Sequence, residues 1–129
     1  MEPTFHHAGI ATEDADALAA LYRDTFGLTV AYTETFDGIY IVFLACGGSY
    51  FELLEPVDND TVAGFLERQG RGVHHLALAV EDVESALYQA RENGVEAIDD
   101  SPREGAWGHE VAFLHPRDTG GVLVEFVGH

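Results

Sequence analysis

The chain has 129 residues, and its 23 acidic side chains outnumber its six basic ones to give a formal net charge of -17. This length suffices for one domain with a sizeable hydrophobic core, so we predict a single domain over residues 1–129. Nucleic acids and anionic membranes are bound by cationic surfaces, and the charge therefore argues against both as partners. All six cations are arginines. An acid excess without lysine favours adaptation to high salt, with an ordinary acidic protein as the alternative.

The single cysteine, Cys46, excludes an intramolecular disulfide. It precedes two glycines at the end of a predicted strand, where we expect a small buried side chain. The N-terminal residues lack the basic and apolar segments of a signal peptide, and no apolar run reaches about 18 residues. These features predict a cytoplasmic protein.

The first half of the chain predicts a strand, a helix and three further strands. The strand begins at His7, and the helix follows Asp14, a candidate N-cap, and ends at Gly27. Short β-like runs follow at residues 28–35, 39–45 and 49–55. A linking helix is predicted at residues 60–69, before a turn at 70–72.

The second half predicts the same order of elements. A strand begins at His75, and a helix runs from the candidate N-cap Asp82 to Gly94. Three β-like runs follow at residues 95–99, 110–114 and 121–127, separated by glycines and prolines.

The two halves form an internal repeat. Two segments share the order His, small or apolar residues, Thr or Val, then Glu-Asp. They are HAGIATEDADAL at residues 7–18 and HLALAVEDVESAL at residues 75–87. Each half is a βαβββ module, over about 4–56 and 72–128, and is too small to bury both faces of its sheet. We therefore predict an α+β fold in which two paired modules form one curved mixed sheet around a metal-binding cleft.

Alternation along the strands places one histidine per module on the predicted cleft face. His7 shares its face with Gly9 and Ala11, and the corresponding histidine, His75, shares its face with Ala77 and Ala79. The small neighbours leave room for a ligand, while the bulkier opposite faces should pack under the helices.

The last strand of each module carries a glutamate within an apolar run, Glu52 in the first and Glu125 in the second. A buried carboxylate is costly unless it is paired or bound to a cation. Together with His7 and His75, these residues offer N and O ligands suited to divalent Co, Mn, Ni, Zn or Mg. The alternatives are capping or core histidines and edge-strand glutamates that face water.

These residues resemble those of a known superfamily. The paired modules, each opened by His and closed by a strand Glu, resemble the vicinal oxygen chelate superfamily of glyoxalases and bleomycin resistance proteins. Within this superfamily, three segments are similar to the methylmalonyl-CoA epimerase family. They are FELLEP (51–56), GVHHLALAVEDV (72–83) and GAWGHEVAFLHPRDTGGVLVEF (105–126). The resemblance implies that the metal ligands are His7, Glu52, His75 and Glu125. Glutamine also occurs at the position of Glu52 in similar epimerases.

The resemblance further implies an isomerase that interconverts (2R)- and (2S)-methylmalonyl-CoA. Abstraction and return of the α-proton would pass through a metal-stabilised enolate, with Glu125 as one acid/base group. It also implies an acyl-CoA substrate and a homodimer. The alternatives are a glyoxalase-type lyase that acts on a glutathione hemithioacetal and a non-enzymatic ligand-binding member of the superfamily.

The sequence leaves several candidates for the second acid/base group. Some relatives carry a glutamate where this chain has Ile41, and the nearby candidates are Glu34, Asp37 or a bound water. Arg103 and Arg117 could contact coenzyme A phosphates or pair with surface carboxylates. His115 could contact the substrate, although closing its own loop is the favoured role.

Overall fold

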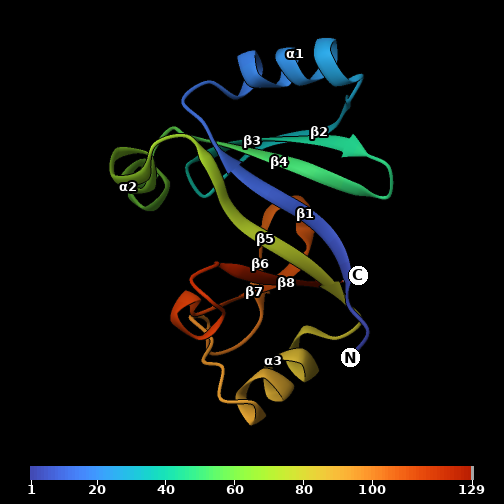
Figure 1. The fold of residues 1–129 in the computed structure, drawn as a ribbon, viewed down its shortest axis with the longest axis vertical. Helices are drawn as coiled ribbons and strands as arrows, with labels where there is room; N and C mark the ends of the chain where they lie inside the picture. Colours follow the sequence, from blue (N-terminus) through green and yellow to red (C-terminus); the bar gives the residue numbers. More distant parts are fainter. Residues whose placement is uncertain (129) are drawn as a thin grey trace. The chain divides into compact units, whose positions relative to one another are not determined.

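The computed structural model describes residues 1–128, which form two compact units (Figure 1). We call residues 7–74 the first module and residues 1–6 with 75–128 the second module. The first repeat comprises β1 (Thr4–Ala11), α1 (Ala15–Phe26), β2 (Thr29–Phe36), β3 (Ile39–Cys46) and β4 (Ser49–Pro56), and α2 (Asp60–Gln69) follows it. The second repeat comprises β5 (Gly72–Val80), α3 (Val83–Glu92), β6 (Arg103–Glu104), β7 (Glu110–Leu114) and β8 (Val124–Gly128). The predicted α+β class and both βαβββ repeats are confirmed.

Both predicted helix N-caps are confirmed. The Asp14 carboxylate accepts a hydrogen bond from the Ala17 amide at 3.0 Å, and the Asp82 carboxylate accepts one from Glu84 at 3.1 Å. These contacts satisfy amides that have no partner inside the helix. Gly27 ends α1 in the left-handed region with φ 74°, as its position predicted.

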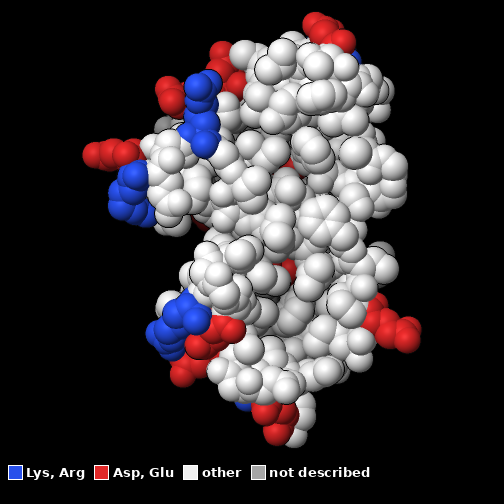
Figure 2. All heavy atoms as spheres, in the orientation of Figure 1, with Lys and Arg blue, Asp and Glu red and all other residues white. Residues whose placement is uncertain are grey.

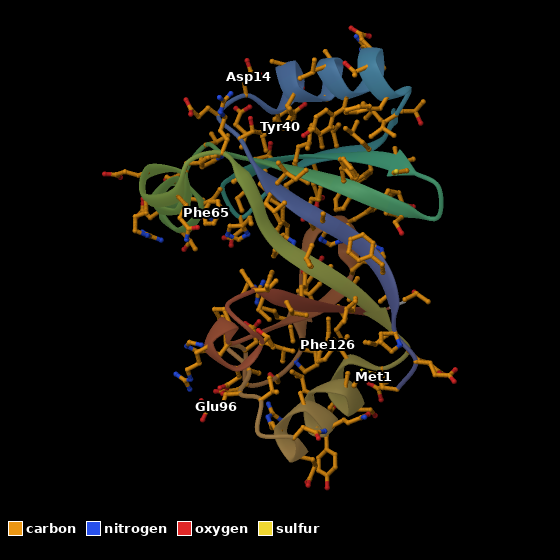
Figure 3. The ribbon with its side chains drawn as sticks, viewed as in Figure 1. Met1, Asp14, Tyr40, Phe65, Glu96 and Phe126 are labelled. Carbon is orange, nitrogen blue, oxygen red and sulfur yellow. The ribbon has the colours of Figure 1, made fainter. Side chains whose placement is uncertain are left out.

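The sheet of the first module has the strand order β2-β3-β4-β1, with β4 and β1 parallel and the other pairs antiparallel. α1 covers one face of this sheet (Figure 1). Leu44, Leu53 and Val42 form the core beneath the helix, and Ala15 and Ala19 close it from above. Figure 3 shows Tyr40 on this side, where its hydroxyl group donates a 2.7 Å hydrogen bond to Asp16 of α1.

The second module repeats this plan with the order β5-β8-β7-β6, in which β5 and β8 are parallel. Phe126 points from β8 toward α3 (Figure 3) and packs in a core with Leu87 and Leu114. Along the strands of each module, residues that face the helix therefore alternate with residues on the opposite face, as the strand pattern predicted.

The predicted strand at residues 95–99 is wrong. Only an isolated bridge between Ala97 and Leu114 forms within the described part of this segment. The Phe113 amide donates to the Asp99 carboxylate at 2.7 Å instead of extending a backbone ladder. A side-chain acceptor therefore ends the pairing after one bridge, and the two-residue strand β6 follows as the sheet edge.

Two further expectations need correction. β8 begins at Val124 rather than at residue 121, because Gly120 and Gly121 adopt φ values of 75° and 84° in a turn. Cys46 is exposed rather than buried, since it is the last residue of β3 and precedes the turn that begins at Gly47.

On the surface that Figure 2 shows, acidic side chains lie beside the arginines. Arg117 pairs with Glu96 at 2.7 Å and Arg103 with Asp99 at 2.9 Å. In the described chain, every helix is too short or too polar to cross a membrane.

Candidate metal centre

The first module brings His7 and Glu52 together on the sheet face away from α1. Parallel pairing of β1 with β4 sets Gly9 opposite Glu52, and His7 lies two residues earlier on the same face. His7 Nε2 lies 3.1 Å from Glu52 Oε1, and both side chains are buried. The predicted register of this strand is therefore correct.

The second module builds the same pair from β5 and β8. Ala77 is paired with Glu125, and His75 lies two residues before Ala77. His75 Nε2 lies 3.2 Å from Glu125 Oε1, and both side chains are again buried. The internal repeat thus extends from sequence to side-chain geometry.

A phenylalanine completes each pair. Phe43 of β3 is the antiparallel partner of Glu52, and its ring centroid lies 5.8 Å from that of His7. Phe113 of β7 is the partner of Glu125, and its ring lies 5.5 Å from His75. Both contacts are edge-to-face. Each ring thus packs against the imidazole of its pair, and the burial of the neighbouring carboxylate strengthens its interaction with a cation.

The donor chemistry of the two pairs fits a divalent metal ion. Across residues 1–128, the buried ionisable side chains are His7, Glu52, His75 and Glu125. Two neutral imidazoles and two carboxylates form a hard-to-borderline donor set without thiolate. Metal–ligand bonds of about 2.1 Å at right angles place adjacent donor atoms about 3 Å apart, which matches the N–O distance within each pair.

Comparison with known families agrees with this geometry. Residues 6–113 match the model of the Glyoxalase/Bleomycin resistance protein/Dioxygenase superfamily. The chain belongs to this superfamily. The matched range contains the whole first pair and His75 of the second.

The relatives of this superfamily member include several methylmalonyl-CoA epimerases. The chain is 38% identical over 125 residues to an ethylmalonyl-CoA/methylmalonyl-CoA epimerase of Cereibacter sphaeroides, covering 93% of each protein. It is similar to the solved structure of a methylmalonyl-CoA epimerase in complex with methylmalonyl-CoA and NH4+, with TM-score 0.94, 38% identity and coverage of 99% of this chain and 95% of the other. A Streptomyces coelicolor methylmalonyl-CoA epimerase variant in complex with 2-nitronate-propionyl-CoA gives TM-score 0.92 and 39% identity, with 97% and 93% covered. The predicted resemblance to this family is confirmed.

The other candidate site residues, His115, Arg103 and Arg117, contact nearby residues of the chain. His115 precedes a short 3-10 helix at Pro116–Asp118, and its Nδ1 atom accepts from the Arg117 amide at 3.4 Å, in agreement with the favoured role in its loop. Arg103 lies over the Phe113 ring at 5.6 Å while it pairs with Asp99. The pairing of both arginines with carboxylates agrees with the surface alternative. A contact of either arginine with coenzyme A stays a prediction.

The sequence interpretation missed the two phenylalanines. Phe43 and Phe113 each stand in a Phe-Leu dipeptide of a strand, so the repeat does carry a signal for them. Their role depends on pairing with a glutamate on another strand, which is a tertiary feature.

Proposed function

We propose that the chain catalyses the divalent-metal-dependent epimerisation of (2R)- and (2S)-methylmalonyl-CoA. The observation that carries the proposal is the duplicated pair of a buried imidazole and a buried carboxylate, at 3.1 Å in the first module and 3.2 Å in the second. The names of the relatives supply the substrate class, because the solved relatives include complexes with methylmalonyl-CoA and with 2-nitronate-propionyl-CoA.

The proposed metal ligands are His7, Glu52, His75 and Glu125. A divalent ion held by them would act as a Lewis acid on the thioester and carboxylate oxygens of the substrate, which acidifies the α-proton and stabilises the enolate. The ligand set suits Co, Mn, Ni, Zn or Mg. Two carboxylates balance the charge of the ion, so the buried site is neutral when it is filled.

Glu125 is the proposed acid/base group of the second module. Its carboxylate is buried beside Phe113 and His75, where it meets few competing water molecules. A carboxylate in this environment can take the α-proton from the substrate and return it. Its Oε1 atom lies 3.2 Å from His75 Nε2, so the carboxylate stands beside the position proposed for the metal ion.

Deuterium exchange tests the proposal directly. Purified protein, loaded with each candidate metal in turn, is incubated in high salt with (2R)- or (2S)-methylmalonyl-CoA in deuterated water. We expect conversion to the other epimer together with deuterium at the α-carbon, and loss of both after chelation of the metal. Absence of both reactions with every metal would overturn the proposal.

A parallel incubation separates this function from the other reactions of the superfamily. The hemithioacetal of methylglyoxal and glutathione is offered under the same conditions. Formation of the lactoyl thioester without epimerisation would identify a glyoxalase-type lyase. Binding without either reaction would indicate a non-enzymatic ligand-binding member.

The assembly and location of the chain also remain proposals. A homodimer follows from the resemblance alone, and sedimentation at high salt would measure it. The cytoplasmic location and the adaptation to high salt likewise stay predictions from the sequence.

A further inference from the structure

The sheet face that carries His7 and Glu52 continues beyond this pair in the first module. The ring of Phe43 contacts His7 at 5.8 Å, and Tyr32 of β2 lies on the other side of Phe43 at 6.4 Å. Tyr32 is the antiparallel partner of Phe43, and Phe43 is the partner of Glu52. These residues therefore form one cross-strand row on the face that carries the candidate ligands.

Glu34 lies in the next row of this same face. It is two residues beyond Tyr32 on β2 and directly opposite Ile41 of β3, which is itself opposite Leu54 of β4. Directly opposite residues point to the same side of a sheet. The Tyr32 hydroxyl group donates a 2.9 Å hydrogen bond to Glu34 Oε2. Glu34 is half-buried, and Tyr32 holds its carboxylate on the face that carries the candidate ligands of this module.

The other candidates near this position are less suited to proton transfer. Ile41 is 2% exposed and carries no ionisable group. Asp37 is exposed in the turn between β2 and β3, with φ 54°, and its carbonyl oxygen accepts from Asn59. Within the β2–β3 hairpin, Glu34 is thus the carboxylate on the face of the candidate ligands.

We infer that Glu34 is the second acid/base group of the epimerisation, a role that rests on the proposed function. Inversion at the α-carbon requires a proton to leave one face and another to arrive on the opposite face. One carboxylate takes the proton while the C–H electron pair passes into the enolate, and the other group, in its acid form, supplies a proton to the same carbon. Glu34 is one of these groups, and Glu125, proposed above, is the other. Exchange with water then restores the protonation states.

A purely structural role for Glu34 gives different expectations. A charge that points inward from an edge strand can prevent unwanted strand pairing, and β2 is the edge strand of the first module. Loss of such a charge would change solubility or stability, without separating proton exchange from epimerisation.

The test compares Glu34→Gln with the wild-type protein and with Asp37→Asn as the matched control. Asparagine tolerates the left-handed conformation at residue 37, so this control removes a nearby carboxylate without straining the turn. Each purified, metal-loaded protein receives (2R)- or (2S)-methylmalonyl-CoA in deuterated water. Chirality and α-deuterium are measured separately, and metal content and the unfolding midpoint are recorded for each variant.

For Glu34→Gln we expect epimerisation to fall about 100-fold or more. One epimer should still acquire α-deuterium with retention of configuration, at a rate within about threefold of the wild-type exchange rate, because Glu125 still serves its face. Asp37→Asn should behave like the wild-type protein. Tyr32→Phe, which removes the hydrogen bond to Glu34, should lower epimerisation by a smaller factor.

Three outcomes would overturn the assignment. Unchanged epimerisation in Glu34→Gln would show that Glu34 transfers no proton. An equal loss of exchange from both epimers, at normal metal content, would indicate a positioning role instead. A wild-type protein that neither epimerises nor exchanges the substrate would overturn the proposed function, and the assignment with it.

Discussion

The two modules hold the same His–Glu–Phe arrangement on differently built sheets. In the first module, β1, β2, β3 and β4 each have eight residues. In the second module, β7 and β8 have five residues each and β6 has two. The Nε2–Oε1 distances nevertheless differ by only 0.1 Å, at 3.1 and 3.2 Å.

This difference shows which parts of a module the ligand pair requires. A parallel strand pair brings His and Glu to one face, and an antiparallel neighbour adds the phenylalanine. The outer strand is not needed for this arrangement, so the second module can shorten it and use loops in its place. One such loop carries Trp107 at φ 61°, a left-handed conformation that is unfavourable for a non-glycine residue. Loops on a rigid sheet are common places for ligand contacts.

The largest expected effect is a difference in kcat between variants of the two candidate glutamate ligands. Glu125→Gln should lower kcat by about 100-fold or more, because an amide cannot accept the α-proton. Glu52→Gln should lower kcat far less, since the amide oxygen atom can still serve as a ligand. Steady-state epimerisation rates at saturating metal measure both variants. Equal losses would show that the two modules contribute in the same way, and a near wild-type rate for Glu125→Gln would remove Glu125 from the mechanism.

Removing one histidine from either module should lower metal affinity to a similar degree. His7→Ala and His75→Ala each delete one ligand and leave its buried glutamate without the imidazole. We expect metal content after dialysis to fall well below one ion per chain in both variants. Elemental analysis measures it, and His109→Ala, a substitution of a histidine outside the ligand set, serves as the control. Full metal content in His7→Ala would show that the first module supplies no ligand through this residue.

The cores under the two helices should be about equally sensitive to truncation. Leu53 and Leu87 are 0% and 1% exposed, beneath α1 and within α3 respectively. Leu53→Ala and Leu87→Ala should each lower the free energy of unfolding by about 3 kcal/mol, through lost burial and a residual cavity. Chemical denaturation at fixed high salt measures this. A much smaller loss for Leu87→Ala would show that the irregular second module relaxes around the cavity.

The smallest expected effect concerns a contact of the first module. The hydrogen bond from Tyr40 to Asp16 connects β3 to α1, and it raises the pKa of Tyr40 because the carboxylate accepts the phenol proton. Tyr40→Phe should lower the free energy of unfolding by about 1 kcal/mol or less, because the bond is solvent-accessible. An unfolding curve that matches the wild type would show that packing alone holds this helix to its sheet.

Several features of the fold were predictable because their signals are local. Asp14 and Asp82 cap their helices through amides two or three residues away, so sequence spacing was sufficient. The strand at residues 95–99 was mispredicted because its backbone partner on β7 is taken by the Asp99 side chain. That competition arises between segments 14 residues apart, and strand propensity carries no information about it.

The sequence by itself determined the repeat, the helix caps and the four candidate ligands, since strand alternation and the repeated His and Glu positions are visible along the chain. Only the tertiary structure decided which residues share a cross-strand row. The pairing of Glu52 with Phe43, and of Glu34 with Ile41, depends on the register between separate strands. A shift of one residue would turn these side chains to the opposite face, and that register is set by the packing of the whole sheet against its helix.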